Sequence, residues 1–370
     1  MRGKKLAEYE LNKIVSPLTE WYKENKRDLP WRKEKNPYYI WISEIMLQQT
    51  RVEAVKPYFE RFIKALPTVQ DVAECEEGRL LKLWEGLGYY NRVRNIQKAA
   101  VQIMDQYGGK FPDDYEKLLL LPGIGDYTAG AIASIAFNLP VPAVDGNVLR
   151  VISRLEESEE DILKQKTKSR IRRELTEIMP LESPGIFNQS LMDLGAAVCL
   201  PNGIPRCDIC PLKDLCLAGQ HQRTAEIPVR KKEKKRRIEE KTVLIIQDGD
   251  HMALRKRPKR GLLAGLYEFP NCEGHLSEEK ALRSVRQYGL TPLWIQPLPE
   301  AKHIFSHVEW RMTGYIIKVA ELEEREKKDL LFVDIQNAEE NYPVPAAFGA
   351  YASYLNLRLG QEKYTGGYGE

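Results

Sequence analysis

The sequence of 370 residues has no apolar run approaching the roughly 18 residues that a membrane-spanning helix needs, so we expect no membrane partner. It also has no internal repeat and, apart from one basic run, no low-complexity tract. Its formal net charge of +3 is close to zero. A nucleic-acid partner must therefore be inferred from local basic patches and not from the total charge. The length leaves room for about two or three domains, each with a full core.

Cysteine is scarce, but four of the six cysteines lie close together: Cys199, Cys207, Cys210 and Cys216, separated by seven, two and five residues. The first five residues are basic and precede a polar, amphipathic stretch, so we expect no signal peptide and a reducing, cytoplasmic compartment. There, clustered cysteines bind metals more often than they form disulfides. Four thiolates suit both zinc and a cubane iron–sulfur cluster. Zinc usually uses two CxxC pairs, whereas only Cys207 and Cys210 form one here.

A glycine turn joins two helix patterns between Tyr115 and Asp145. The stretch Tyr115–Leu121 is apolar at helical spacing, and Pro122 ends it. Gly123 and Gly125 allow a tight turn whose backbone amides can face an anion. The helix that restarts at Asp126 is rich in Ala, Gly and Ser, so a neighbouring backbone can pack closely. This pattern predicts a helix-hairpin-helix that binds DNA phosphates, with an ordinary αα-hairpin as the alternative.

The basic run Arg230–Lys241 contains eight Lys or Arg and three Glu, and we predict a domain linker over residues 221–240. A solvated linker is the favoured interpretation over a phosphate-tracking strand. Apolar spacing upstream predicts helices over Leu6–Trp21, Tyr39–Phe62, Leu80–Trp84, Asn95–Tyr107, Val148–Leu155 and Ser169–Ile178. Downstream, Thr242–Ile246 and Met312–Ile317 are typical of strands, so the two halves differ in structural class.

Several motifs together resemble the adenine DNA glycosylase (MutY) family of the helix-hairpin-helix superfamily, which also contains endonuclease III. They are LPWR at Leu29–Arg32, SEIMLQQTRV at Ser43–Val52, GLGYYNRVRN at Gly86–Asn95, the hairpin, VDGNV at Val144–Val148, the four cysteines, and FSH at Phe305–His307. The first cysteine gap is seven residues here, where the family usually has six. The extra residue falls in the loop Leu200–Arg206, which contains Pro, Asn and Gly and can absorb it.

The resemblance implies a multidomain fold. An all-α helix-hairpin-helix glycosylase domain would span residues 1–220, with a six-helix barrel over about 31–137 and a cluster module from 1–30 and 138–220. Cys199, Cys207, Cys210 and Cys216 would bind one [4Fe-4S] cluster. An α+β Nudix-like domain would cover 241–359, followed by a tail at 360–370.

Glu44 lies in the apolar stretch Ile40–Leu47, where a solvated glutamate has no obvious place. Burial would raise its pKa and keep the carboxyl protonated near neutral pH. Such a group can act as a general acid, and adenine leaves a sugar readily only after a ring nitrogen is protonated. The alternative is a helix-surface glutamate that pairs with Gln48 or Arg51. The resemblance assigns Glu44 the acid role, toward N7 of adenine.

Asp145 would stabilise the positive charge that develops on the sugar as the base departs. Its alternative role, an N-cap for the next helix, is compatible with that one. By resemblance, Tyr127 and Asn147 help to hold Asp145 and the deoxyribose. In the endonuclease III branch a lysine occupies the hairpin position of Tyr127 and attacks the sugar. Because Tyr127 offers no amine, we predict a monofunctional glycosylase that leaves an abasic site.

A glycosylase must take its base out of the stack, which requires a wedge and a pocket. By resemblance, Gln49 and Tyr89 form the wedge near the lesion pair, and Gln189 suits hydrogen bonding to an adenine edge. The same resemblance assigns pocket and DNA contacts to Arg27, Leu29, Trp31, Arg32, Gln48, Thr50, Gly123 and Gly125. Taken alone, Leu29 and Trp31 are more typical of a core.

The segment Gly261–Pro270 looks like the one that precedes the catalytic box of Nudix hydrolases, but the box itself is missing. Where those enzymes carry metal-binding glutamates, this chain has Arg286–Leu290, so magnesium lacks a carboxylate pair. The domain would recognise a purine without hydrolysing it. In the family it contacts 8-oxoguanine, and Phe305, Ser306 and His307 match the loop that does so.

We therefore predict a monomeric, cytoplasmic, nucleoid-associated enzyme of bacterial type that removes adenine opposite 8-oxoguanine or guanine in double-stranded DNA. Two alternatives stay open. The first is an endonuclease III-like glycosylase and lyase, against which Tyr127 and the C-terminal domain count. The second is a non-catalytic DNA-binding protein, against which the apolar surroundings of Glu44 count.

Overall fold

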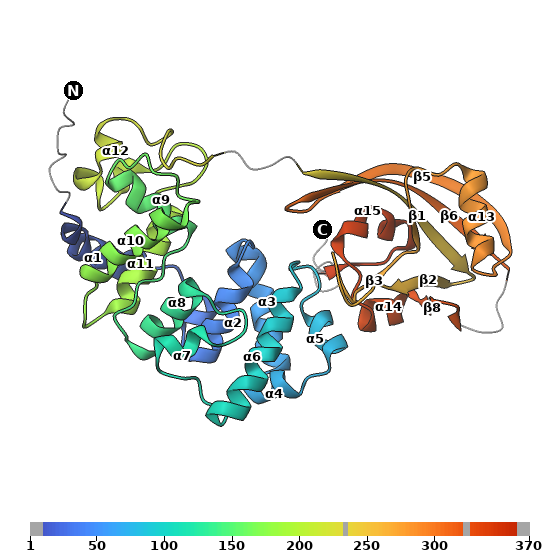
Figure 1. The fold of residues 1–370 in the computed structure, drawn as a ribbon, viewed down its shortest axis with the longest axis horizontal. Coiled ribbons are helices and arrows are strands. Elements are labelled where there is room, and N and C mark those ends of the chain that lie inside the picture. The colour runs from blue at the N-terminus through green and yellow to red at the C-terminus, as the bar shows by residue number, and fades with distance from the viewer. Residues whose placement is uncertain (1–9, 232–235, 321–325, 361–370) are drawn as a thin grey trace. The chain divides into compact units, whose positions relative to one another are not determined.

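The computed structural model describes residues 10–231, 236–320 and 326–360, and these fall into two compact units (Figure 1). The first unit comprises Met1–Glu74 and Asn95–Lys232, and the second comprises Cys75–Arg94 and Glu233–Glu370. The predicted class is confirmed, because the first unit is helical and the second combines helices with a mixed sheet. The predicted domain limits place residues 75–94 in the helical domain, whereas they belong to the second unit. Residues 361–370 of the predicted tail lie outside the described residues.

Every regular element among the described residues of the first unit is a helix. The α-helices are α1 (Val15–Asn25), α2 (Pro37–Leu47), α3 (Val52–Ala65), α4 (Val69–Glu74), α6 (Asn91–Tyr107, which begins in the second unit), α7 (Tyr115–Leu119), α8 (Asp126–Phe137), α9 (Gly146–Leu155), α10 (Gln165–Glu177), α11 (Pro184–Ala197) and α12 (Leu217–Gln220). Short 3-10 helices are η1 (Leu11–Ile14), η2 (Pro30–Arg32), η3 (Cys207–Ile209) and η4 (Lys213–Leu215). In the described part of the chain, no helix combines the length and apolar character needed to cross a membrane.

The single helix predicted over Tyr39–Phe62 is wrong, because the chain forms two helices there, α2 and α3. Gln49 has a φ of 62°, a left-handed conformation that cannot continue an α-helix. Neither Gly nor Pro marks this break, and the apolar spacing runs across it, so the pattern gave no sign of it. The break leaves Gln48, Gln49 and Thr50 in a turn.

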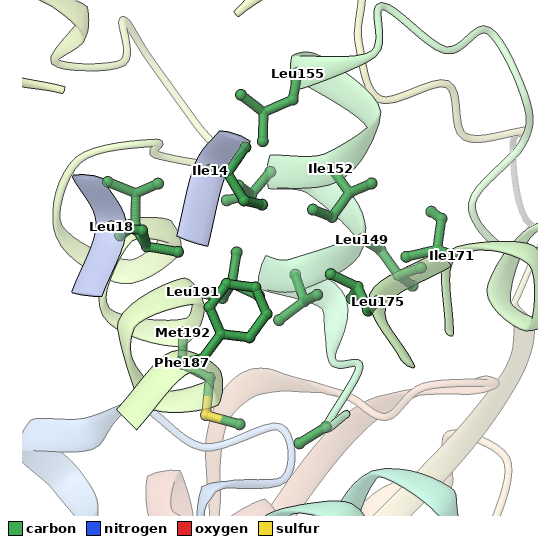
Figure 2. Close-up of a cluster of buried hydrophobic side chains, with 14 of the residues drawn as sticks. Ile14, Leu18, Leu149, Ile152, Leu155, Ile171, Leu175, Phe187, Leu191 and Met192 are labelled. Carbon is green, nitrogen blue, oxygen red and sulfur yellow. The ribbon is translucent and has the colours of Figure 1, made fainter. Parts of the chain in front are cut away.

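Side chains from η1, α1, α9, α10 and α11 converge on one apolar cluster of the first unit (Figure 2). Ile14, Leu18, Ile152 and Phe187 in this cluster are all fully buried. Each such side chain contributes about 1.5–3 kcal/mol through removal from water. The cluster therefore fixes α9 and α11 side by side, with Asp145 at the N-terminus of α9.

Small residues on α8 and α11 let backbones approach closely, as the composition of α8 predicts. A Cβ atom on Gly130 of α8 would lie 2.5 Å from the carbonyl oxygen of Pro142. A Cβ atom on Gly185 of α11 would lie 2.7 Å from the carbonyl oxygen of Ser134 in α8. Both distances are shorter than a carbon and an oxygen tolerate, so only glycine fits either position.

The second unit is built on a mixed sheet whose described strands run in the order β5-β6-β1-β2-β8-β7, with β3 paired to β2 and β4 to β1. The strands are β1 (Arg237–Asp248), β2 (His251–Lys256), β3 (Tyr267–Glu268), β4 (Asn271–Glu273), β5 (Pro292–Ile304), β6 (Val308–Val319), β7 (Glu326–Lys327) and β8 (Leu330–Asp334). Helices α5 (Glu77–Leu83), α13 (Glu278–Gln287), α14 (Ile335–Asn341) and α15 (Gly349–Ala352) belong to the same unit, with η5 (Ala346–Phe348) and η6 (Ser353–Leu355). The strands β1 and β6 are parallel, and both predicted strands lie within them.

The predicted linker ends earlier than expected. Residues 237–240 already belong to β1 and pair with β6, and the Trp310 indole N–H donates to Glu239 at 2.8 Å. The charged pattern of this stretch concealed the strand, because its side chains are largely solvated while its backbone is paired. Residues 232–235 of the linker lie outside the described residues.

Alternate residues of β1 face two different cores. Val243 and Ile245 pack in the cluster that contains Tyr351, while Leu244 and Ile246 pack in the cluster that contains Val285 of α13. The sheet is therefore buried on both faces, which explains the continuous apolar sequence of β1.

Gly130→Ala should lower the free energy of unfolding by about 1–3 kcal/mol, because the new methyl group must displace the Pro142 backbone. Gly146→Ala is the matched control, since a Cβ there meets no atom within 4 Å. Urea unfolding followed by circular dichroism measures both, and equal midpoints for the two variants would contradict the proposed steric contact.

Candidate active site

One cavity of about 880 Å³ gathers most of the predicted site residues of the first unit. Its wall is formed by α2, the turn after it, α8, the start of α9 and α11. The predicted residues that line it are Arg27, Leu29, Trp31, Arg32, Glu44, Gln48, Gln49, Thr50, Tyr127, Asp145, Asn147 and Gln189. Leu29 and Trp31 are also buried, so the core and pocket interpretations of these two residues hold together.

Glu44 lies on α2 and is only 6% exposed, so the surface-glutamate alternative is wrong. The Tyr127 hydroxyl donates to its Oε2 at 2.5 Å. Burial raises the pKa of Glu44 to about 7; the Tyr127 hydrogen bond lowers it and the nearby Asp145 raises it. The carboxyl is therefore protonated in a large share of molecules at neutral pH.

Asp145 caps α9 and lines the same cavity. Its Oδ1 accepts the backbone N–H of Val148 at 2.7 Å, and its Oδ2 accepts the Asn147 amide at 2.8 Å. Burial raises the pKa of Asp145, whereas these hydrogen bonds favour its charged form. Two carboxyls with different surroundings thus share one cavity, and this is the arrangement in which one can donate a proton while the other stays ionised.

Tyr127 also contacts the acid, since its hydroxyl donates to Glu44; its support of Asp145 and the deoxyribose stays a prediction. Burial, reinforced by the Glu44 charge, raises the pKa of Tyr127 well above its ordinary value. The phenol therefore remains a hydrogen-bond donor throughout the neutral range.

Sequence reasoning missed Asp193, which organises the arginines of the cavity. It accepts hydrogen bonds from Arg27 Nε at 2.8 Å and from Arg32 Nη1 at 2.7 Å, while fully buried. Burial by itself would raise the pKa of Asp193, but the two guanidiniums outweigh it and hold the pKa below its ordinary value. An acidic residue inside the apolar stretch Leu191–Leu194 was the available signal, as it was for Glu44.

Gln189 is also oriented by the protein. The Tyr22 hydroxyl donates to its Oε1 at 3.1 Å, and its Nε2 donates to the Gly185 carbonyl at 3.2 Å. These two hydrogen bonds fix which end of the amide is the oxygen and which is the nitrogen. The side chain therefore presents an acceptor and a donor in defined positions to the cavity.

The hairpin has the predicted geometry. Gly123 has a φ of 79°, and a Cβ there would lie 2.7 Å from Cβ of Asn95. Gly123 and Gly125 are both exposed at the start of α8. The N-terminal amides of this helix can therefore face an anion.

The four clustered cysteines line a separate cavity of about 260 Å³ in the first unit. Within the described ranges, no three His, Cys, Asp or Glu side chains are arranged to hold one metal ion. Burial raises the pKa of Cys210 to about 12, so a thiolate there needs a positive partner. The Leu200–Arg206 loop, which carries the extra residue, closes back through the Arg206 N–H to the Val198 carbonyl at 3.0 Å.

A hydrogen-bonded chain, also missed from the sequence, joins Asp145 to this cysteine cavity. Asn147, which donates to Asp145, accepts from Arg150 Nη2 at 2.9 Å. Arg150 Nε in turn donates to the Cys199 carbonyl at 2.9 Å. Arg154 adds a direct contact, since its Nη1 lies 3.2 Å from the Cys199 sulfur.

The remaining predicted residues lie in the second unit, around a cavity of about 680 Å³. Tyr89, Phe305, Ser306 and His307 all line it. Ser306 Oγ lies 3.1 Å from His307 Nδ1, and the Phe305 ring contacts Trp310 with centroids 4.9 Å apart. The structure thus brings Tyr89 together with the three-residue loop of the C-terminal domain.

Two family profiles match the chain. The profile of the HhH-GPD superfamily of base excision DNA repair proteins matches residues 42–180, and that of the NUDIX domain matches residues 242–353. A relative named adenine DNA glycosylase, from Buchnera aphidicola subsp. Acyrthosiphon pisum, is 33% identical over 330 residues, which cover 88% of this chain and 93% of the relative. The chain belongs to the adenine DNA glycosylase family.

A second adenine DNA glycosylase, from Arabidopsis thaliana, is 36% identical, with 82% of this chain and 56% of the relative covered. Among solved structures, a thermostable thymine-DNA glycosylase has a TM-score of 0.51 at 28% identity, covering 57% of this chain and 97% of that one. An endonuclease III–DNA complex has a TM-score of 0.50 at 26% identity, covering 59% and 98%. Both support the helix-hairpin-helix fold of this adenine DNA glycosylase family member.

The raised pKa of Glu44 predicts a pH-dependent cost to stability. The pKa is raised from 4.5 to about 7, so the folded state binds the Glu44 proton more tightly than the unfolded state does. Folding therefore carries no charge penalty at Glu44 below pH 4.5, and stability is lost as the pH rises through about 7. Glu44→Gln should therefore gain stability over the wild type across this range, approaching about 3 kcal/mol at pH 8. Urea unfolding at pH 5 and pH 8 measures the gain, and a difference independent of pH would contradict it.

Proposed function

We propose that this enzyme removes adenine paired with 8-oxoguanine or guanine, by flipping the adenine and hydrolysing its N-glycosidic bond with acid assistance. Family membership makes it a DNA glycosylase of base excision repair. The observation that carries the proposal is Glu44, buried in an 880 Å³ cavity with a pKa raised to about 7 and with Asp145 in the same cavity wall.

In the proposed reaction, the flipped adenine enters this cavity and Glu44 donates its proton to N7. The bond between N9 and the sugar then breaks, and its electron pair leaves with the base. Asp145, held by Val148 and Asn147, stabilises the positive sugar until water adds to it and gives one proton to the Glu44 carboxylate, which restores the acid. Tyr127 holds the acidic carboxyl of Glu44 in place.

The pocket residues have separable roles in this proposal. Arg27 and Arg32 are fixed by Asp193, and Gln189 is fixed by Tyr22, so the adenine meets groups that are already oriented. Pre-organised donors lose little conformational entropy when the base binds. The hairpin amides of Gly123 and Gly125 would bind backbone phosphate.

A monofunctional reaction is supported by the composition of the cavity wall. Among the described residues that line the cavity, none is a lysine, and Tyr127 stands at the hairpin position. A Schiff base with the sugar needs an amine, so this wall favours hydrolysis over the lyase alternative.

Recognition of the opposite base is proposed for the second unit. Ser306 offers a hydroxyl to 8-oxoguanine, and His307, whose Nδ1 lies 3.1 Å from that hydroxyl, supports it. Tyr89 from the same cavity and Gln49 from the first unit are proposed as the wedge. The monomeric state and the cytoplasmic, nucleoid-associated location remain predictions.

One [4Fe-4S] cluster is proposed as the occupant of the cysteine cavity. The donor set fits, because four thiols line about 260 Å³, and the Arg154 guanidinium contacts the Cys199 sulfur. Zinc would need four sulfurs about 2.3 Å from one point, whereas a cluster spreads its ligands over a larger volume. When bound, a cluster would cross-link residues 199–216 and offer a one-electron redox centre.

The acid role of Glu44 predicts a specific pH profile for adenine release. Single-turnover release from A opposite 8-oxoguanine should be near constant below about pH 7 and fall about tenfold per pH unit above it, because the protonated form is the active one. Glu44→Gln should lose at least about 100-fold below about pH 7, and the difference from the wild type should shrink as the pH rises above it, because the wild type then loses its own acid. Glu53→Gln, an exposed carboxylate at the same cavity, is the control. Unchanged release by Glu44→Gln would overturn the assignment.

The cluster proposal predicts about four iron atoms per chain and broad visible absorption in protein purified without oxygen. Cys210→Ser should lose most of the iron, while Cys272→Ser, outside the cysteine cavity, should keep it. One zinc atom per chain in place of iron would contradict the proposal, and elemental analysis distinguishes the two metals.

A further inference from the structure

Residues 75–94, here called the wedge segment, connect α4 to α6 in the sequence but form one compact unit with the Nudix-like domain. They contain α5, the loop Gly86–Tyr89 and the first turn of α6. Chain order alone would assign Tyr89 to the unit that holds Glu44 and Asp145. The contacts of the segment assign it to the unit that holds Ser306.

A buried polar anchor joins α5 to α14. Lys82 Nζ donates to the carbonyl oxygens of Ala338 at 3.0 Å and Tyr342 at 2.8 Å, and it pairs with Glu85 at 3.2 Å. Glu85, 2% exposed, accepts the backbone N–H of Val344 at 2.8 Å. Buried networks of this kind have one geometry, because any shift leaves a charge or a carbonyl without its partner.

A second anchor joins the start of α6 to the loop Gly261–Ala264. Arg94 Nη2 donates to the Ala264 carbonyl at 2.6 Å, and its Nε pairs with Glu77 at 2.8 Å. A Cβ on Gly265 would lie 3.0 Å from Arg94 Nη2, so the glycine makes room for the guanidinium. This loop lines the same cavity as Tyr89 and Ser306.

Between the two anchors the loop is internally braced. The Gly88 carbonyl accepts both the Trp84 indole N–H at 3.1 Å and Arg92 Nη2 at 3.1 Å, and the Leu87 carbonyl accepts Arg92 Nη2 at 2.9 Å. Tyr89 has a left-handed φ of 49° and is 52% exposed. A large side chain in that conformation persists only where the surroundings impose it. The loop therefore displays Tyr89 in a preset orientation.

We propose that Lys82, Glu85 and Arg94 are positioning residues that fix Tyr89 to the lesion-recognition domain, so that reading the opposite base and inserting Tyr89 occur as one event. The inference rests on the proposed function. Its physical basis is that Tyr89 and Ser306 line one cavity, braced on both sides by hydrogen bonds within one unit. The binding free energy of the contacts to 8-oxoguanine can then offset the cost of unstacking the base pair.

The test uses the full-length protein, with Arg94→Met to remove one anchor and Lys82→Met combined with Glu85→Gln to remove the other. The paired substitution avoids leaving a buried carboxylate without its cation, and glutamine keeps an acceptor for Val344. Lys98→Met, an exposed site further along α6, is the control. Thermal unfolding checks that each variant is folded, and Arg94→Met decides the outcome if the paired variant is not.

Adenine release is measured under single-turnover conditions for A opposite 8-oxoguanine and A opposite guanine. Each anchor variant should lose about tenfold on the first substrate and about two- to threefold on the second, because only the first offers the 8-oxo contacts that the anchors transmit. The control should match the wild type. Equal losses on both substrates, or no loss on either, would overturn the inference.

A double-mutant cycle with Tyr89→Ala separates positioning from general destabilisation. If the anchors act through Tyr89, removing them in the Tyr89→Ala background should change the rate less than about twofold. The same tenfold loss in both backgrounds would refute the inference while leaving the glycosylase function intact. A wild type that binds lesion DNA yet releases no adenine would instead refute the proposed function itself.

Discussion

The burial of one carboxyl group, that of Glu44, is the constraint around which the first unit is arranged. A carboxylate removed from water must be neutralised or given donors, and here the outcome is a pKa of about 7 with a hydrogen bond from Tyr127. Asp193 shows the opposite solution, since two guanidiniums keep its pKa low. As a result, a carboxyl that is largely protonated near neutral pH and two fixed guanidiniums line the same cavity.

That arrangement depends on close packing as much as on charge. The apolar cluster of α1, α9, α10 and α11 (Figure 2) fixes these helices. Asp145, at the start of α9, and Gln189, on α11, therefore line one cavity. Glycines at the helix contacts remove the side chains that would hold the backbones apart. A Cβ on Gly195 of α11 would lie 2.6 Å from Cβ of Asn147, the residue that donates to Asp145. A side chain at Gly195 would thus displace Asn147 and, through it, the Asp145 carboxylate.

The two units hold the residues of two different proposed tasks. The acid and the pocket belong to the first unit, whereas Tyr89 and Ser306 belong to the second. The Nudix-like sheet serves as a support: β5 and β6 carry the loop at residues 305–307 between them, and α14 receives the Lys82 anchor. The Nudix-like sheet is complete, although Arg286–Leu290 stands where the catalytic box carries its glutamates.

Local sequence determined the features whose physics is local: the glycine hairpin, Asp145 as an N-cap, the apolar core of β1 and an acid in an apolar helix. Tertiary structure alone decided the rest. The break at Gln49 has no sequence signature, since the left-handed residue is a glutamine and neither Gly nor Pro stands at the turn. Arg150 and Asp193 matter through partners as far as 166 residues away in the chain, and spacing cannot reveal such pairs. Tyr89 likewise belongs to the second unit because Lys82 and Arg94 contact residues more than 150 positions away in the chain. Propensity and periodicity act over a few residues, whereas a site is assembled by the free energy of contacts between distant ones.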